Sequence, residues 1–318
     1  MRLSAADCLR RGWTNVSANW ELVVIQWLES FLVAALLALG LVLALLILGM
    51  DALTAGRWTA REIEETVRRL ADFSPPLLLA SIAVVAVWLL TLLLHCFFQA
   101  GTYGILTAAD RQALPGGRRQ RLLFRTFSLR DFLGWGGLYV WRFFGMLVLC
   151  VGLALLVGMG VLLWLVFMGA GGARWGAPAA MGIGCGGALP VGFLLLVLGL
   201  WFHVAQAGLA REGSGVRAAA RQGLSVLGRR LGTVIALAVL FVGIAVVLAF
   251  VFLPLSAVTD SLLAGAPRLR ALVQLILLLL QSLPSTLLAV GLAGSLVALV
   301  RSETKGEIRR RPPEVQAA

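Results

Sequence analysis

Long, uninterrupted apolar runs dominate the pattern of this chain. Six stretches contain no Asp, Glu, Lys or Arg, and each is long enough to cross a bilayer, which takes about 20 residues of helix. Allowing for flanking residues, the pattern predicts spanning helices at about 22–50, 76–103, 138–169, 178–209, 232–258 and 271–300. The expected fold is an all-α polytopic membrane helix bundle with one domain over residues 1–300.

Three of the apolar runs end in a similar short sequence, shortly before a basic segment. The endings are Gln99-Ala100-Gly101, Gln206-Ala207-Gly208 and Leu292-Ala293-Gly294. This recurrence predicts one helical hairpin written three times, so that the six spans form three out-and-back pairs.

A short serine-led segment precedes each odd-numbered span. The paired positions, three residues apart, are Ser4 and Asp7, Ser128 and Asp131, and Ser214 and Arg217. The first two pairs have the spacing of a helix capping box, whereas the third lacks the acid. We expect interfacial elbow helices here. They either anchor the bundle, which we favour, or form a surface groove for lipid or a partner.

The first loop contains a further amphipathic pattern. Thr59 and Glu62 have capping-box spacing, and Ile63, Val67 and Leu70 fall on one helical face. This predicts a helix on the membrane surface. Charge pairing with arginines four residues away explains the acidic residues of this loop better than a metal site does.

Charge then gives an orientation. The chain is 60% hydrophobic and 13% charged, and its 27 basic residues include one lysine, Lys305. Assigned to alternate sides, 19 of them fall with the two termini and 7 on the other side, with Arg142 left at the edge of a span, which predicts cytoplasmic termini. Most of the net charge of +12 is therefore explained by the orientation of the spans in the membrane. We expect contact with membrane lipids rather than nucleic acid, and a flexible cytoplasmic tail over residues 301–318.

The two histidines are the strongest candidates for chemistry inside the spans. His95 and His203 each precede a glutamine of the repeated endings, Gln99 and Gln206, by about one helical turn. They could form a proton relay or metal pair, or they could make interhelical hydrogen bonds to glutamine or to backbone carbonyls. We favour hydrogen bonds, because only Cys96 lies near as a further ligand.

The last span carries a second polar group. Gln274, Gln281 and Ser285 fall on one side of a helix that Pro284 should kink. They could line a substrate path gated by the kink, or they could be polar contacts buried between helices. The second interpretation is favoured, since no charged residue shares the stripe.

Other features give no catalytic or metal site. Glu29 and Arg142 border spans, and we expect both to reach the headgroups. The glycines at 182 and 186 favour close helix packing, with the spacing of a small-residue contact. The four cysteines are scattered and have the spacing of neither a disulfide framework nor a zinc site.

Six spans, serine-led elbows and Ala-Gly endings before basic segments resemble a loose group of uncharacterised prokaryotic membrane families. Their best-known relative is the membrane domain fused to some bacterial glycerophosphodiester phosphodiesterases. The resemblance covers most of residues 1–300, and we expect a multi-pass protein of the bacterial cytoplasmic (inner) membrane. The phosphodiesterase is a separate barrel domain that nothing here matches, so its activity is not implied.

Two function classes remain. The first is a non-catalytic membrane module that supports a membrane protein partner or organises lipid, with no cofactor. The alternative is a transporter or flippase-like permease for a small or amphiphilic substrate. A central cavity lined by Gln274, Gln281 and the histidines would favour transport, and a bundle packed shut would favour the module. An enzyme is not expected, because no acid, base, nucleophile and metal can be assembled.

Overall fold

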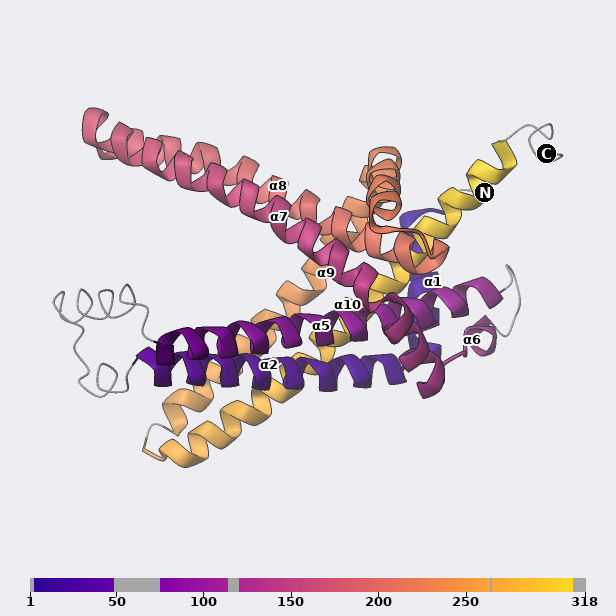
Figure 1. Cartoon of the computed structure of the whole chain (residues 1–318), viewed down its shortest axis with the longest axis horizontal. Coiled ribbons are helices and arrows are strands. Elements are labelled where there is room, and N and C mark those ends of the chain that lie inside the picture. Colours follow the sequence, from indigo (N-terminus) through magenta and orange to yellow (C-terminus); the bar gives the residue numbers. More distant parts are fainter. Residues whose placement is uncertain (1–2, 49–74, 114–119, 264, 311–318) are drawn as a thin grey trace.

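The computed structural model describes residues 3–48, 75–113, 120–263 and 265–310, and these residues form helices joined by short connections (Figure 1). The long helices are α2 (Glu21–Leu48), α5 (Pro75–Gln112), α7 (Leu129–Trp175), α8 (Ala177–Glu212), α9 (Val216–Leu262) and α10 (Pro267–Arg310). All six are long and apolar enough to cross a membrane, which confirms the predicted helical membrane bundle. The helix predicted near residues 59–70 lies outside the described residues.

The helices pack as three successive pairs: α2 with α5, α7 with α8, and α9 with α10. The pairs meet at the end that contains α1 (Ala5–Ala18), which we call the closed end (Figure 1). At the opposite, open end, the α7–α8 pair points away from α2 and α5. Almost all buried residues lie near the closed end, such as Leu22 to Glu29 in α2 and Leu288 to Ser302 in α10.

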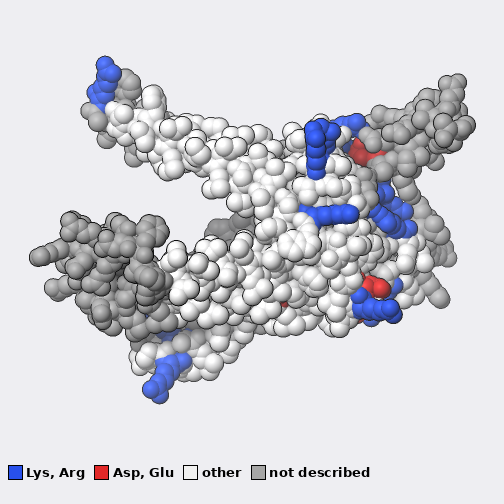
Figure 2. All heavy atoms as spheres, viewed as in Figure 1, with Lys and Arg blue, Asp and Glu red and all other residues white. Residues whose placement is uncertain are grey.

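The described surface between the two ends is broad and mostly apolar. In the view of Figure 2, the described charged side chains cluster at the closed end and at the tips of the hairpins. Exposed large apolar residues fill the stretch between them, for example Leu163, Val166 and Phe250. This is the surface expected of helices that face hydrocarbon.

The first elbow is a separate helix with a complete cap. The backbone N–H of Asp7 donates to Ser4 Oγ at 3.2 Å, and the N–H of Ser4 donates to Asp7 Oδ2 at 3.1 Å. The Ser4 hydroxyl also donates to Asp7 Oδ2, at 2.7 Å, and this bond together with the one from the Ser4 N–H holds the pKa of exposed Asp7 below its usual value. The capping box predicted for α1 is therefore present.

The other two elbows are continuous with the spans that follow them. Ser128 Oγ accepts the N–H of Asp131 at 3.1 Å, and α7 then runs for 47 residues without a break. Such a helix is about 70 Å long, more than twice the hydrocarbon thickness. In α9, Gly215 caps the helix without a side-chain hydrogen bond, and the helix continues from elbow to span through a kink at Arg230, whose backbone is non-helical.

The glycines of the three repeated endings all lie at close contacts between hairpins. A Cβ on any of them would lie 3.0 Å or less from an atom of the helical segment that leads into another hairpin. The contacts are Gly101 with the ring of Phe132, Gly208 with Gln222, and Gly294 with the backbone of Gly12. The elbow of α7 therefore packs on the first hairpin, that of α9 on the second, and α1 on the third, so the contacts close into a ring.

A buried charge cluster also joins the hairpins at the closed end. Asp110, only 2% exposed, pairs with Arg11 at 2.5 Å and with Arg301 at 3.0 Å. Arg11 also donates to the carbonyl of Ala113 at 3.0 Å, at the end of α5. The cluster ties α1, α5 and α10 together. α10 continues to Arg310, and Arg301 and Ser302 are buried against the bundle, so the helix stays packed past the predicted start of the flexible tail.

Glycine packing in the α7–α8 pair differs from the prediction. A Cβ on Gly182 or Gly186 would meet nothing within 4 Å, so the expected small-residue contact is absent there. Gly187 lies directly against the ring of Trp164 instead. The face of α8 that turns toward α7 is one residue further round the helix than the spacing suggested.

Candidate functional site

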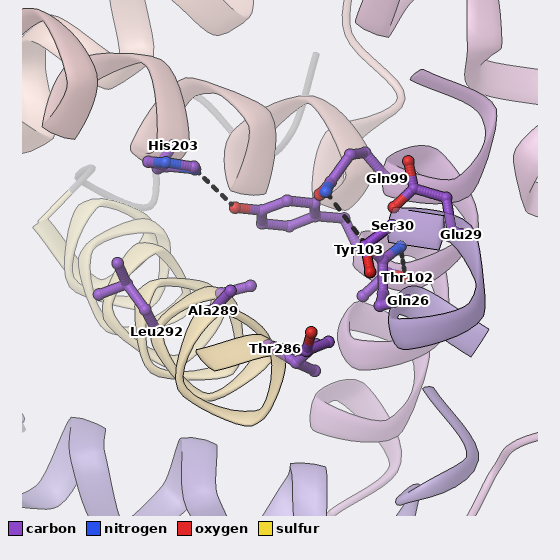
Figure 3. A pocket seen from close by; sticks show the side chains of 12 residues that line it. Gln26, Glu29, Ser30, Gln99, Thr102, Tyr103, His203, Thr286, Ala289 and Leu292 are labelled. Atoms are coloured by element: carbon purple, nitrogen blue, oxygen red, sulfur yellow. Dashed lines mark hydrogen bonds between the residues drawn. The ribbon is translucent and has the colours of Figure 1, made fainter. Parts of the chain in front are cut away.

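A cavity of about 200 Å³ lies between four helices, close to the closed end (Figure 3). Eight of its twelve lining residues are polar, although the helices that supply them are mostly apolar. The polar residues are Gln26, Glu29 and Ser30 of α2, Gln99, Thr102 and Tyr103 of α5, His203 of α8 and Thr286 of α10. Three hairpins thus contribute to one polar site.

Glu29 is the only acidic or basic side chain, histidine aside, among the lining residues that the structure describes. It is 4% exposed, and its Oε1 lies 2.9 Å from Nδ1 of His95 on α5. Among the described residues, no hydrogen bond reaches its other oxygen, Oε2. The expectation that Glu29 reaches the headgroups is wrong, because this position of α2 faces α5 rather than the surface.

Amide side chains form a short chain of hydrogen bonds beside Glu29. Gln26 Nε2 donates to Thr102 Oγ1 at 2.8 Å, and Gln99 Nε2 donates to Gln26 Oε1 at 3.3 Å. Gln26 and Thr102 are buried. These bonds fix the orientation of the polar wall between α2 and α5.

Two hydroxyl groups present oxygen lone pairs to the cavity. Ser30 Oγ donates its hydrogen to the carbonyl of Trp27 at 2.6 Å, and Thr286 Oγ1 donates to the carbonyl of Ser282 at 2.9 Å. A hydroxyl has one hydrogen and two lone pairs, so both groups remain acceptors. The cavity wall is consequently rich in hydrogen-bond acceptors.

His203 lies across the cavity from this wall, as Figure 3 shows. Its Nδ1 is 3.4 Å from the hydroxyl of Tyr103. The imidazole is exposed although its neighbour Val204 is buried, because it faces the open space. Both histidines therefore contact another helix, His95 at Glu29 and His203 at Tyr103. His203 also has a hydrogen bond with Gln206 of its own helix, so the predicted glutamine partner is found for His203, but within α8 rather than between helices.

The remaining candidate residues lie elsewhere. Gln206 is buried in α8 and does not line the cavity. Gln274 exchanges two hydrogen bonds of 3.2 Å with Ser256 of α9, which makes it a contact between helices. Gln281 and Ser285 are exposed. Of the seven candidates, the structure brings Gln99 and His203 to the cavity and His95 behind Glu29.

Chemically, this arrangement can bind a ligand and hold a proton. Within the described residues there is no group of three or more His, Cys, Asp or Glu side chains that could hold a metal ion.

Arg142, also expected at the headgroups, is half-buried: it lies over the ring of Tyr139, and its guanidinium donates to the carbonyl of Gly213.

No model of a known protein family, no curated protein and no solved structure matches this chain. The geometry of the cavity is therefore the basis for a function.

Proposed function

We propose that this protein is a permease or flippase-like membrane protein that binds the polar part of a small or amphiphilic molecule in the central cavity. The observation that carries this proposal is the buried Glu29, which shares a polar cavity with seven other polar side chains. Burying polar groups is costly, and an ionisable residue inside a membrane span indicates a functional site by default. The proposed role is binding and movement, without catalysis.

The two ends of the bundle suggest a route. The Arg11–Asp110–Arg301 cluster seals the closed end, whereas the exposed lining residues, His203 and Ala289, leave the cavity open on the side of α8 and α10. Beyond it the hairpins diverge. A ligand would therefore enter from the bilayer or from the open end.

The internal repeat supports the same role. We propose that the three hairpins are copies of one unit in the bacterial inner membrane, with the closed end and both termini in the cytoplasm. Transporters often bind substrate where repeated units meet, and this cavity is lined by helices of three hairpins.

The exposed apolar hairpin arms favour a second candidate, a module that supports a membrane partner or organises lipid. In that role the cavity would be filled by a lipid headgroup that does not cross the bilayer. Movement of lipid across the bilayer distinguishes the two candidates, because only the permease would cause it.

The test is lipid movement in reconstituted vesicles. The probes are phosphatidylcholine, phosphatidylethanolamine and phosphatidylglycerol, each labelled with a fluorophore on an acyl chain, and dithionite bleaches the outer leaflet. We expect the protein to speed the crossing of at least one probe. Ala289→Phe, which fills the cavity, should abolish the effect, and Leu278→Phe on the exposed surface of α10 should retain it.

Crossing of all three probes at the rate of protein-free vesicles would reject the permease and leave the module. An Ala289→Phe variant as active as the wild type would reject the cavity as the route.

A further inference from the structure

The lining of the cavity indicates the charge of its ligand. We propose that the cavity binds a cation whose charged group is a primary ammonium, held by Glu29. This inference rests on the proposed function and specifies the substrate class of the same site.

The first argument is the carboxylate. Glu29 is buried and lines the cavity, and in the described part of the chain only its Oε1 is hydrogen-bonded, to His95. A carboxylate has about four acceptor sites on two oxygens. A carboxylate removed from water needs a partner of opposite charge or further hydrogen bonds. Oε2 is therefore available to a donor that enters the cavity.

The second argument is the balance of donors and acceptors. Ser30 and Thr286 donate their hydroxyl hydrogens to backbone carbonyls, so they face the cavity as acceptors. Gln99 donates to Gln26, and no hydrogen bond reaches its own Oε1 in the described structure. An ammonium group has three hydrogens and no lone pair, so it complements such a wall.

The third argument is the distribution of positive charge. No lysine or arginine is among the described residues that line the cavity. Arg11 and Arg301 lie at the closed end and are engaged by Asp110. A phosphate or other anion would meet the Glu29 carboxylate with no lysine or arginine of the cavity wall to pair with, so the site disfavours it.

An aromatic ring adds to this preference. Tyr103 lies between Gln99 and His203 along the cavity wall (Figure 3), and the negative face of an aromatic ring attracts a nearby cation. Its hydroxyl is directed toward His203. The ring and the carboxylate thus favour the same charge.

The test measures binding of three short amphiphiles that differ only in the head: hexylammonium, hexyl phosphate and 1-hexanol. Titration calorimetry uses the full chain in lipid nanodiscs, with empty nanodiscs subtracted. We expect hexylammonium to bind at least 10-fold more tightly than hexyl phosphate. Glu29→Gln should remove this preference, and Glu29→Asp, which keeps the charge, should retain it.

Glu21→Gln is the matched control. Glu21 lies on the same helix and pairs with Arg125 at 2.7 Å, but it does not line the cavity. The Glu21→Gln variant should prefer hexylammonium to hexyl phosphate as strongly as the wild type does. Size-exclusion elution and the fluorescence of the ten tryptophans report whether each variant is folded.

Hexyl phosphate binding as tightly as hexylammonium, or Glu29→Gln behaving like Glu21→Gln, would overturn the inference. Equal binding of all three probes, together with lipid crossing in vesicles, would leave the proposed function standing and reject only the ammonium. Absence of binding by all three would reject the ammonium site, and absence of lipid crossing as well would reject both proposals.

Discussion

The closed and open ends of the bundle use the same six helices in different ways. At the closed end, side chains from α1, α5, α8 and α10 are buried against one another, whereas the open-end halves of the helices expose most of their apolar side chains. The polar cavity lies at the boundary between the packed halves and the exposed halves of the helices. The comparison shows that hydrophobic content makes these helices suited to a membrane, whereas a few glycines and charged residues determine where the helices contact one another.

Glycine shows this contrast most clearly. A Cβ on Gly12, Gly101 or Gly104 would collide with a neighbouring helix, so the close approach at the closed end requires glycine. A Cβ on Gly152 or Gly158 would meet nothing within 4 Å. Glycine is therefore required at these contacts of the closed end, whereas Gly152 and Gly158 have no packing role; Gly187, against Trp164, is an exception in the α7–α8 pair.

The largest expected effect is at the buried charge cluster. Asp110→Ala leaves the guanidiniums of Arg11 and Arg301 without their carboxylate, which should lower the free energy of unfolding by about 3–5 kcal/mol. The matched control is Asp260→Ala near the open end. Asp260 forms an exposed pair with Arg270 and should contribute at most about 1 kcal/mol.

Denaturant unfolding in detergent measures both free energies. Equal losses in the two variants would show that the closed end is not held by its charge cluster.

Alkaline pH should weaken the closed end through Cys8. Burial raises the pKa of the Cys8 thiol to about 11 from an ordinary 9.0, so the unfolded chain loses this proton first as the pH rises. The contribution to stability is complete below about pH 9 and is lost between pH 9 and 11, at about 1.4 kcal/mol per pH unit.

The difference between the wild type and Cys8→Ala isolates this titration from other groups that titrate in the same range. The free energy of unfolding of the wild type should fall more steeply above pH 9. Parallel curves would mean that the thiol is accessible to water.

Adding one methyl group should have opposite signs at the two ends. Gly12→Ala places a Cβ against the backbone of Ser295, which cannot yield easily, and should cost about 1–3 kcal/mol. Gly158→Ala has open space and should stabilise α7 by up to about 1 kcal/mol. Thermal unfolding should shift down for the first variant and up for the second, and shifts of the same sign would contradict the packing described.

The smallest effect concerns the elbow caps. Ser4→Ala removes the cap of α1 and should cost about 1 kcal/mol. Ser214→Ala should cost no more than a few tenths, because Gly215 caps α9 without a side-chain bond. Unfolding curves of the two variants that overlay would remove the distinction between the elbows.

Much of this fold could be predicted from the sequence. Uncharged runs located the six spans because a helix in lipid must satisfy its own backbone, and Ser4 with Asp7 gave the cap of α1. The ring of contacts could not be predicted, because the packing of α1 on α10 depends on tertiary geometry. The burial of Arg301 could not be predicted either, because its partner Asp110 lies far away in the sequence.

The site was predicted less well. Glu29 was considered only along its own helix, where the headgroups seemed within reach. The signal that could have found it is the hairpin itself: Glu29 and His95 lie at nearly equal distances along the chain from the two ends of the first loop, so antiparallel spans bring them together. By contrast, the spacing of Gln281 and Ser285 placed both residues on one face of the helix but did not indicate whether that face is buried or exposed.

The most direct test of the central claim is the reactivity of a cysteine in the cavity. In a background without Cys8, Cys96, Cys150 and Cys185, Ala289→Cys and Leu278→Cys are treated in lipid vesicles with a charged, membrane-impermeant thiol reagent. Both residues are exposed on α10, but only Ala289 lines the polar cavity. We predict rapid modification at position 289 and almost none at 278, and equal rates, or no reaction at 289, would contradict a water-accessible cavity inside the bundle.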